Sequence, residues 1–287
     1  MKIAAYQAPL LPAGSINRAL ALIRRQIACC ETAGVEILCC PEAVLGGLAD
    51  YARHPSTIAL DAERQLGDVL EPLASDRVTT IVGFTEKDRR GRLYNAAAVW
   101  QKGSVSGLYR KLHPAINHSV YERGADTTVF TVGDLTFGIV ICRDSIFGEP
   151  ARRIAAQGAA VLFVPTNNGM PAAKGGRELV TDARNTDVAR AIETGMSVVR
   201  ADVSGRAGHL VSYGSSTIVD GAGSVLASAR PMGADLLVAE IASTIGNRRG
   251  SQTPAGERNV REDAVRRMGR HGLQLTHAEH VVSRQGR

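Results

Sequence analysis

The chain has 287 residues, of which 44% are apolar, 22% charged and 4% aromatic, and its formal net charge is +6. That length suffices for one large α/β domain or two modest ones, and the scarcity of aromatic residues leaves Ala, Val, Ile and Leu to build the core. No apolar run approaches the roughly 18 residues of a membrane span, and the first residues lack the apolar stretch of a secretion signal. We therefore expect no membrane-spanning helix, a cytoplasmic location by default, and no membrane partner.

The first half of the chain alternates predicted strands with predicted amphipathic helices. Apolar runs predict strands over residues 2–7, 35–40, 79–84 and 94–101, and a short one from Val105. Apolar side chains at helical spacing predict helices over residues 15–32 and 61–75. A turn at residues 88–92 makes the third and fourth strands an antiparallel hairpin.

The second half continues this alternation without a linker, which predicts one α/β domain over residues 1–240. A hairpin is expected from residues 128–132 and 135–142. Helices are expected over residues 149–157 and 178–194, with the strand 160–164 and the polar loop 165–176 between them. The remaining predicted strands are residues 197–203, 216–219, 224–227 and 236–240.

The net positive charge comes mainly from the end of the chain. Residues 241–287 hold nine Arg and four acidic residues, so their net charge of +5 leaves only +1 for residues 1–240. The arginines are spread among Gly, Ser, Gln and acidic residues, with no aromatic side chain on which a base could stack. We therefore predict no nucleic-acid partner, and a basic carboxy-terminal extension that covers a neighbouring subunit or is partly disordered.

The five cysteines, in a chain without a secretion signal, indicate free thiols in a reducing compartment. Four of them form the adjacent pairs Cys29–Cys30 and Cys39–Cys40. Metal-binding pairs usually stand two residues apart so that both sulfurs converge, whereas adjacent side chains diverge on a helix and point to opposite faces of a strand. We interpret these four as packing residues and expect no metal.

Three reactive residue types stand where predicted regular structure ends. Glu42 follows the strand 35–40, Lys111 lies in YRKLHP, and Cys142 ends the apolar run GIVIC. In open α/β sheets, ligands usually bind at the carboxyl ends of strands. On position alone Cys142 is more typical of a packing cysteine, so its interpretation depends on Glu42 and Lys111.

Together these residues supply a base, a cation and a nucleophile. A thiol with a pKa of about 8.5 is a poor nucleophile at neutral pH unless a neighbouring base or cation favours the thiolate. Glu42 could take the thiol proton and later activate a water. Lys111 could stabilise the oxyanion of a tetrahedral intermediate, together with the backbone N–H of Arg143. Such a set predicts attack on an amide or nitrile carbon through a thioester.

The sequence resembles the nitrilase superfamily of carbon–nitrogen hydrolases, whose catalytic residues are Glu, Lys and Cys in that chain order. The matching motifs are LCCPEAVLGG around Glu42, YRKLHP around Lys111, GIVICRDSIFGEPAR around Cys142, the strand with Gln7, ARAIETGMSVVRADVSG and YGSSTIVDGAGSVLA. The resemblance covers residues 1–240 in order and spacing. It implies a four-layer αββα sandwich, assembly as a homodimer or higher homo-oligomer with the extension 241–287 over a neighbour, and no metal or organic cofactor.

Some positions depart from the family pattern. Members often carry a second Glu, between the lysine and a Pro-Gly turn, that helps to position the substrate. If Arg123-Gly124 matches that turn, Asn117 falls at the Glu position, whereas a gapped alignment places Glu122 there. The loop that begins with Thr166 and Asn167 is either a turn or a source of substrate contacts. These four residues, Asn117, Glu122, Thr166 and Asn167, are the candidate substrate-binding residues.

Other charged residues have simpler interpretations. Glu149 and Arg152 stand at i,i+3 in the helix after the cysteine and are predicted to form a structural ion pair, as are Arg190 and Glu193. His113 could be the base of a Cys-His dyad, but a carboxylate base leaves it no role.

We therefore expect an amidase, in which Cys142 attacks an amide carbonyl, ammonia or an amine leaves, and water activated by Glu42 hydrolyses the thioester. An amide is favoured because family nitrilases usually carry Trp-Glu after the cysteine, whereas Arg143-Asp144 resembles the amidase and carbamoylase branches. An N-carbamoyl amino acid hydrolase or a nitrilase of the same superfamily stays open. So do a catalytically idle oligomeric interaction module and a protein that binds through its basic tail.

Overall fold

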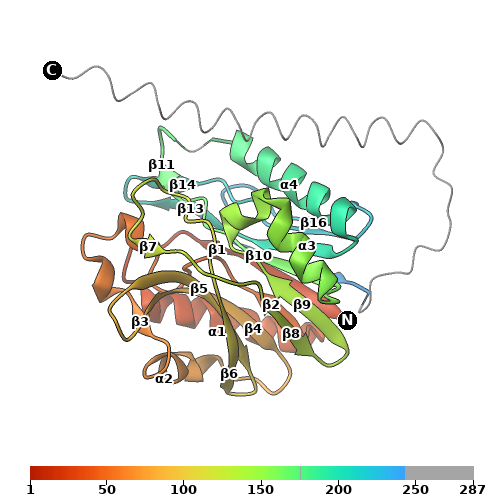
Figure 1. Cartoon of the computed structure of the whole chain (residues 1–287), viewed down its shortest axis with the longest axis horizontal. Helices are drawn as coiled ribbons and strands as arrows, with labels where there is room; N and C mark the ends of the chain where they lie inside the picture. Colours follow the sequence, from red (N-terminus) through yellow and green to blue (C-terminus); the bar gives the residue numbers. More distant parts are fainter. Residues whose placement is uncertain (175, 243–287) are drawn as a thin grey trace. The chain divides into compact units, whose positions relative to one another are not determined.

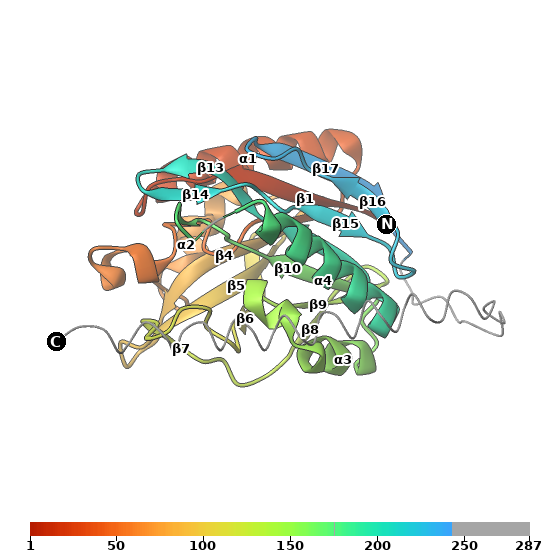
Figure 2. The same cartoon turned by 90° about the horizontal axis from the view of Figure 1, so that it is seen from above.

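The computed structural model describes residues 1–174 and 176–242 of the chain. In this part of the chain two β-sheets lie face to face, and helices cover the outer face of each sheet (Figures 1 and 2). The predicted four-layer αββα sandwich is thus confirmed.

Among the described residues, the larger sheet has 11 strands and the smaller sheet six. The main path of the larger sheet runs in the order β11-β14-β13-β1-β2-β4-β5-β6, and the smaller sheet has the order β16-β15-β12-β10-β9-β8. The larger sheet consists of β1 (Lys2–Pro9), β2 (Ile37–Cys39), β3 (Leu60–Asp61), β4 (Thr79–Lys87), β5 (Leu93–Gln101), β6 (Ser104–Arg110), β7 (Tyr121–Glu122), β11 (Met170–Pro171), β13 (Val203–Ala207), β14 (Leu210–Ser212) and β17 (Asp235–Glu240). The smaller sheet consists of β8 (Val129–Val132), β9 (Leu135–Ile139), β10 (Val161–Pro165), β12 (Ser197–Ala201), β15 (Thr217–Val219) and β16 (Val225–Ser228).

The helices pack on opposite sides of this pair of sheets. The α-helices are α1 (Ile16–Ala33), α2 (Leu66–Leu70), α3 (Gly148–Ala156) and α4 (Glu178–Thr194). Short 3-10 helices are Ala49–Tyr51, Pro55–Thr57, Glu71–Leu73 and Cys142–Ile146. The helix α1 ends at Gly34, whose φ of +70° is the left-handed conformation that glycine adopts without strain.

Both faces of each sheet are buried, one against the other sheet and one against helices. Because successive side chains of a strand point to opposite faces, nearly every residue of a central strand must be apolar. Along β1, Ile3 and Ala5 belong to the core between the sheets, whereas Ala4 and Tyr6 pack with Ile23 of α1. In the smaller sheet, Phe163 of β10 faces the larger sheet, whereas its neighbours Leu162 and Val164 pack with Ile154 of α3 and Ala191 of α4. Each fully buried Val, Leu, Ile or Phe side chain stabilises the fold by about 1.5–3 kcal/mol. A continuous apolar strand is therefore what this architecture requires.

The predicted helix over residues 61–75 is wrong in extent. Asp61 ends the short strand β3, α2 covers only Leu66–Leu70, and a 3-10 helix follows at Glu71–Leu73. Pro72 has no backbone N–H and its ring obstructs the preceding turn, so the α-helix cannot continue through it.

The predicted strand over residues 197–203 is two strands in different sheets. β12 ends at Ala201 and pairs with β10, whereas β13 starts at Val203 and pairs with β1. The chain changes sheets at Asp202, whose buried carboxylate accepts hydrogen bonds from the backbone N–H groups of Val203 and Ser215. The hairpin partner of β13, β14, has no counterpart in the sequence prediction.

The paired cysteines divide by burial. Cys30, Cys39 and Cys40 are buried, which confirms their predicted packing role, whereas Cys29 is exposed on α1, so that interpretation was wrong for it. Burial raises the pKa of the Cys30 thiol to about 12, which keeps it neutral.

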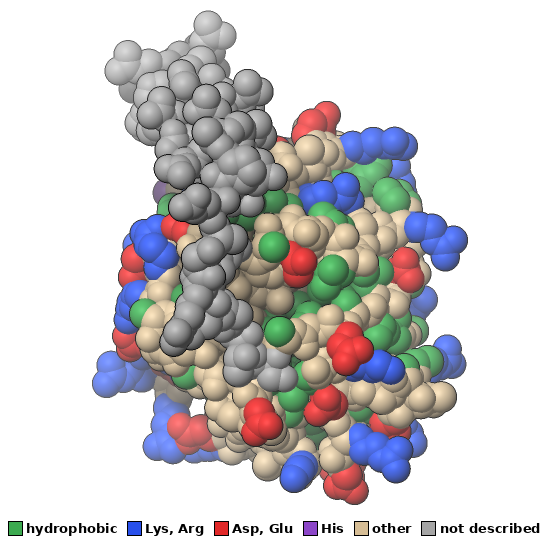
Figure 3. Space-filling model, turned by 90° about the vertical axis from the view of Figure 1, so that its right-hand side faces the viewer, with side chains coloured by type: hydrophobic (Ala, Val, Ile, Leu, Met, Phe, Trp, Pro, Cys, Tyr) green, Lys and Arg blue, Asp and Glu red, His purple; other side chains and the backbone are tan. Residues whose placement is uncertain are grey.

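The described part of the chain closes on itself. The terminal ammonium of Met1 donates to the carbonyl of Ile241, and the N–H of Ile241 donates to the carbonyl of Met1. The predicted extension 241–287 lies outside the described residues from residue 243 onward. On the face seen in Figure 3, basic and acidic side chains are interspersed. Within residues 1–174 and 176–242, no helix is long and apolar enough to cross a membrane.

Candidate active site

The predicted reactive residues come together because the strands before them run in parallel within each sheet. β1, β2 and β4 are parallel neighbours, and so are β9, β10 and β12. Glu42 follows β2, Cys142 follows β9 and Thr166 follows β10, so all three lie beyond carboxyl ends of strands. The two sheets bring these ends together across the sandwich, since the N–H of Glu42 donates to the carbonyl of Thr166 at 3.3 Å.

Glu42 and Lys111 form a buried ion pair. The Nζ of Lys111 lies 2.5 Å from Oε1 of Glu42, and the two side chains are 3% and 2% exposed. Asn95 on β5 donates from Nδ2 to the same oxygen at 2.7 Å, and the backbone N–H of Asn167 donates to Oε2 at 2.8 Å. Both carboxylate oxygens of Glu42 therefore hold fixed positions.

The charge of Lys111 is stabilised by its surroundings. Burial alone would lower its pKa, but the negative charge of Glu42 and the hydrogen bond to it outweigh that effect, and the pKa is raised above its usual value. Lys111 is therefore a cation at neutral pH. A fixed cation of this kind is suited to stabilise an oxyanion.

Cys142 starts a 3-10 helix three residues after the end of β9, with a strained backbone. Its φ of +46° is uncommon for any residue other than glycine, and Ser145 secures the turn by donating from Oγ to the carbonyl of Cys142 at 2.8 Å. Burial and the nearby charge of Glu42 raise the pKa of the thiol to about 12, against the opposing effects of Lys111 and Arg200. The resting thiol is therefore neutral, and it could act as a nucleophile only if a base removed its proton.

Asp144 links the cysteine turn to the lysine segment. It is fully buried, and its carboxylate accepts hydrogen bonds from the hydroxyl of Tyr109 at 2.8 Å and from the backbone N–H groups of Leu112 and His113 at 3.2 and 2.7 Å. The backbone N–H of Ile141 is also a donor, at 3.2 Å. One carboxylate thus fixes the segments on either side of the site.

His113 is held by Asp144 rather than by Cys142. Its Nδ1 lies 3.0 Å from Oδ1 of Asp144, and its ring stacks on Phe147 with the ring centres 4.1 Å apart. These contacts of His113 are with Asp144 and Phe147, and no hydrogen bond joins it to Cys142 among the described residues.

The predicted substrate-binding residues lie in two places. The structure brings Thr166 and Asn167 into the site, where they contact Glu42 through backbone atoms. Asn117 and Glu122 are both exposed, and among the described residues neither has a hydrogen bond to Glu42, Lys111 or Cys142. The structure thus gives Thr166 and Asn167 a role in holding Glu42. The predicted oxyanion contact of the Arg143 N–H stays a prediction.

The predicted Glu149–Arg152 ion pair is wrong. Arg152 of α3 reaches Glu193 of α4 at 2.6 Å, and Glu149 lies 3.5 Å from Arg153, one turn along α3. The i,i+3 rule considers one helix alone, whereas here a neighbouring helix offers a closer carboxylate. The predicted pair of Arg190 with Glu193 is confirmed at 3.1 Å.

The sequence prediction missed three residues of the site, Asn95, Asp144 and Arg200. Each is a buried polar or charged side chain, at 2%, 0% and 3% exposure. Asn95 and Arg200 interrupt the apolar strands β5 and β12, and a polar residue within a buried strand needs a partner. That signal could have identified both, although not their partners.

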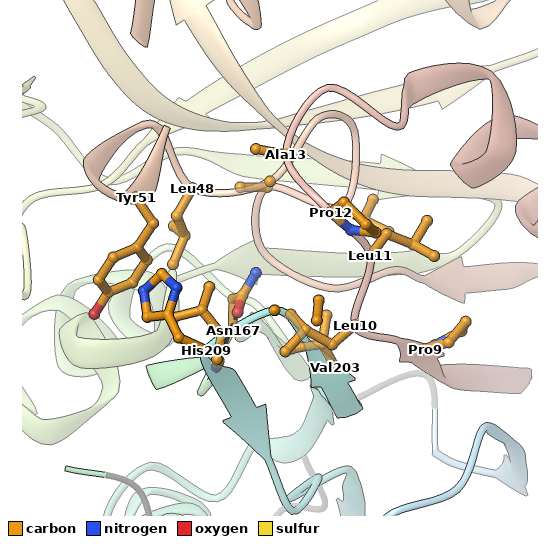
Figure 4. Close-up of a pocket in the computed structure, with 17 residues that line it drawn as sticks. Pro9, Leu10, Leu11, Pro12, Ala13, Leu48, Tyr51, Asn167, Val203 and His209 are labelled. Atoms are coloured by element: carbon orange, nitrogen blue, oxygen red, sulfur yellow. Dashed lines mark hydrogen bonds between the residues drawn. The ribbon is translucent and has the colours of Figure 1, made fainter. Parts of the chain in front are cut away.

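Figure 4 shows a pocket of about 210 Å³ whose described lining residues include neither Glu42 nor Lys111 nor Cys142. Ala43, the residue after Glu42, and Asn167 form part of its wall. Figure 4 shows Leu48 and Tyr51 contributed by one loop and Val203 and His209 by the β13–β14 hairpin. The other lining residues are Pro9, Leu10, Leu11, Pro12, Ala13, Val44, Gly47, Gly169, Ala207, Gly208 and Leu210. Among the described residues, none that lines this pocket is Asp, Glu, Lys or Arg.

Gly83 on β4 allows the segment that carries Glu42 to pack closely. A Cβ at this position would lie 2.3 Å from the carbonyl oxygen of Pro41 and 2.8 Å from the Cα of Glu42. We expect Gly83→Ala to displace this segment, to lower the free energy of unfolding by about 1–3 kcal/mol, and to reduce catalytic activity. Urea unfolding followed by circular dichroism measures the first effect.

Gly67→Ala is the matched control for this substitution. Nothing lies within 4 Å of a Cβ added to Gly67 in α2, so we expect that variant to be neutral or more stable by up to about 1 kcal/mol. Equal unfolding midpoints for the Gly83→Ala protein and the unmodified protein would contradict the packing argument.

Three comparisons with known proteins agree with one another. A sequence model of the carbon–nitrogen hydrolase family matches residues 2–249. A Pseudomonas protegens protein described as the hydrolase in the pqqF 5′ region is 29% identical over 245 residues, covering 80% of this chain and 79% of that protein. A nitrilase from Pyrococcus abyssi is 31% identical over 188 residues, covering 65% and 64%. The solved structure of an amidase from Nesterenkonia sp. AN1, with acrylamide added to its active-site cysteine, matches with a TM-score of 0.71 at 26% identity, covering 87% of this chain and 96% of that chain.

Proposed function

Because the chain belongs to the carbon–nitrogen hydrolase family, we propose that it hydrolyses a small amide to a carboxylic acid and ammonia or an amine. We propose Glu42, Lys111 and Cys142 as its catalytic residues. The observation that carries the proposal is the buried Glu42–Lys111 ion pair, whose charges both act on the Cys142 thiol at a strained turn.

The proposed reaction uses each of these groups twice. Glu42 takes the proton of the Cys142 thiol as the sulfur attacks the amide carbon, and Lys111 and the N–H of Arg143 stabilise the oxyanion. The C–N bond then breaks, and Glu42 returns the proton to the leaving nitrogen, which leaves a thioester on Cys142. Glu42 next takes a proton from a water molecule that attacks the thioester. Collapse of the second oxyanion releases the acid, and the proton returns to the sulfur.

We propose that this pocket, which adjoins Glu42 through Ala43 and Asn167, receives the substituent of the substrate, and its lining favours an uncharged group. A carboxylate or ammonium group on the substrate would lose its hydration in this pocket without meeting an opposite charge among the described lining residues. Apolar side chains and the polar groups of Tyr51, Asn167 and His209 suit an apolar group with one or two hydrogen-bonding atoms. We therefore propose a neutral amide with an apolar substituent in preference to an N-carbamoyl amino acid.

A panel of neutral aliphatic and aromatic amides, N-carbamoyl amino acids and nitriles tests this function. We expect the neutral amides to give the highest kcat/KM for ammonia release, and an acyl adduct whose mass appears on Cys142 in intact-protein mass spectrometry. Preferred turnover of N-carbamoyl amino acids would contradict the substrate class. If no compound acylates Cys142, and iodoacetamide modifies it no faster than Cys29, the catalytically idle module is favoured instead. The homo-oligomer expected from the family resemblance stays a prediction.

A further inference from the structure

A buried arginine that the reaction above does not use connects both halves of the site. Arg200 on β12 is 3% exposed, and its guanidinium forms a two-pronged ion pair with Asp187 of α4, from Nε at 2.8 Å and from Nη2 at 2.5 Å. Thr217 on β15 also donates to Asp187, at 3.0 Å. The guanidinium has donors to spare beyond this pair.

One remaining contact of Arg200 reaches the cysteine turn. Its Nη2 donates to Oγ of Ser145 at 3.0 Å, and the same hydroxyl donates to the carbonyl of Cys142 at 2.8 Å. The Ser145 hydroxyl can therefore not rotate away without breaking two hydrogen bonds. This chain of contacts supports the positive φ of Cys142, which is a conformation that needs support.

The other remaining contact reaches the segment that holds Glu42. Nη1 of Arg200 donates to Oγ1 of Thr166 at 2.7 Å. The carbonyl of Thr166 accepts the backbone N–H of Glu42, and the next residue, Asn167, donates its N–H to the Glu42 carboxylate. Arg200 thus contacts Thr166, which holds the segment of Glu42, as well as Ser145, which holds the turn of Cys142.

We propose that Arg200 is a positioning residue that fixes Cys142 and Glu42 relative to each other through Ser145 and Thr166. The naming of Glu42 and Cys142 as base and nucleophile rests on the proposed function, whereas the positioning itself does not. A planar guanidinium spans the two hydroxyls and Asp187 at once, which the single ammonium of a lysine cannot do.

The charge of Arg200 acts in the same direction. The groups whose charges act on the Cys142 thiol are Glu42 and Asp202, which disfavour the thiolate, and Lys111 and Arg200, which favour it. Removing Arg200 leaves one of the two cations. The proposal therefore predicts an effect on thiol reactivity as well as on turnover.

The test must separate positioning from stability, because Arg200→Met alone leaves the buried Asp187 carboxylate without its counterion and could unfold the protein. The double variant Arg200→Met/Asp187→Asn removes both charges, and the amide introduced in place of the carboxylate still offers an oxygen to Thr217. Ser145 and Thr166 keep their own donor bonds, to the carbonyls of Cys142 and Val164. We expect this variant to fold, as judged by circular dichroism.

Two measurements on this double variant test the proposal. The first is the rate at which iodoacetamide alkylates Cys142 across pH 6–10, measured by peptide mass spectrometry with the exposed Cys29 as internal reference. The second is kcat and KM for an amide substrate. We expect alkylation of Cys142 and kcat each to fall roughly 10- to 100-fold, with the alkylation profile moved to higher pH and KM changed less than kcat.

Three single variants complete the experiment. Arg200→Lys keeps the positive charge but loses the planar guanidinium that contacts both hydroxyls and Asp187, so we expect alkylation to recover more than kcat. Thr166→Val removes the Arg200 contact on the Glu42 side, together with the local hydrogen bond from Thr166 to the carbonyl of Val164, so we expect kcat to fall more than alkylation. Arg190→Met is the matched control, because Arg190 is a partly buried arginine of α4 paired with Glu193, and we expect both readouts to be unchanged.

Alkylation and kcat within twofold of the unmodified protein in the folded double variant would overturn the proposal. Equal losses in Arg190→Met would also overturn it, because any lost buried arginine would then have the same effect. If the unmodified protein hydrolyses no amide, the proposed function fails, but alkylation still decides whether Arg200 positions Cys142.

Discussion

Replacing Cys142 by Ala is expected to reduce amide hydrolysis to the background rate. The sulfur forms the only covalent bond to the substrate in the proposed reaction, so its loss should lower kcat on the order of 10⁴-fold or more. The variant should fold, since alanine fits where the larger cysteine side chain sits at the start of the 3-10 helix. Ammonia release and intact mass measure the loss of turnover and of the acyl adduct, and thermal unfolding checks the fold.

Cys29→Ala is the matched control for this variant. Cys29 is an exposed thiol on α1, so its removal tests whether the loss of a cysteine elsewhere in the protein also lowers turnover. We expect unchanged turnover and an unchanged adduct in that protein. Turnover by the Cys142→Ala protein at the rate of the unmodified protein would remove the basis of the proposed mechanism.

Replacing Glu42 by Gln should have the second largest effect, on both activity and stability. Glutamine cannot take the thiol proton, and loss of a general base typically lowers kcat 10²- to 10⁴-fold. The Lys111 ammonium would also lose its buried counterion, which costs about 3–5 kcal/mol of unfolding free energy if the charge is kept. Burial would then act on Lys111 unopposed by Glu42, so its pKa should fall.

Glu86→Gln provides a matched loss of a buried carboxylate. Glu86 on β4 is 2% exposed and pairs with Arg110 through two hydrogen bonds, outside the proposed catalytic groups. We expect that variant to lose stability while retaining most of its turnover. A Glu42→Gln protein with the same modest loss of kcat would show that Glu42 is a structural carboxylate.

The sequence predicted the parts of this molecule that depend on local patterns. Apolar runs identified most strands, and the residues that ended three segments were Glu42, Lys111 and Cys142. The structure pairs the first two, although they stand 69 positions apart. Which strand ends meet depends on sheet order, and the family resemblance supplied that information where periodicity could not.

The contacts that fix the site were not predictable in the same way. In the sequence, Asp144 served only to distinguish the amidase and carbamoylase branches from the nitrilases. Its hydrogen bonds could not be predicted, because the donors Tyr109, Leu112 and His113 lie more than 30 positions away. Arg200 binds Ser145 across 55 positions. Helical spacing gave the correct partner for Arg190 but the wrong one for Arg152, whose partner lies on another helix.

The carboxylate of Asp144 limits how this enzyme can be re-engineered. Because one side chain receives donors from the lysine segment and from the cysteine turn, neither segment can be exchanged for that of a relative without the other. The β13–β14 hairpin, by contrast, borders the pocket with Val203, His209 and Leu210 and makes none of these bonds. Because we propose that this pocket receives the substrate, we expect loop grafting at the hairpin to change selectivity while it leaves the hydrogen bonds of Asp144 intact.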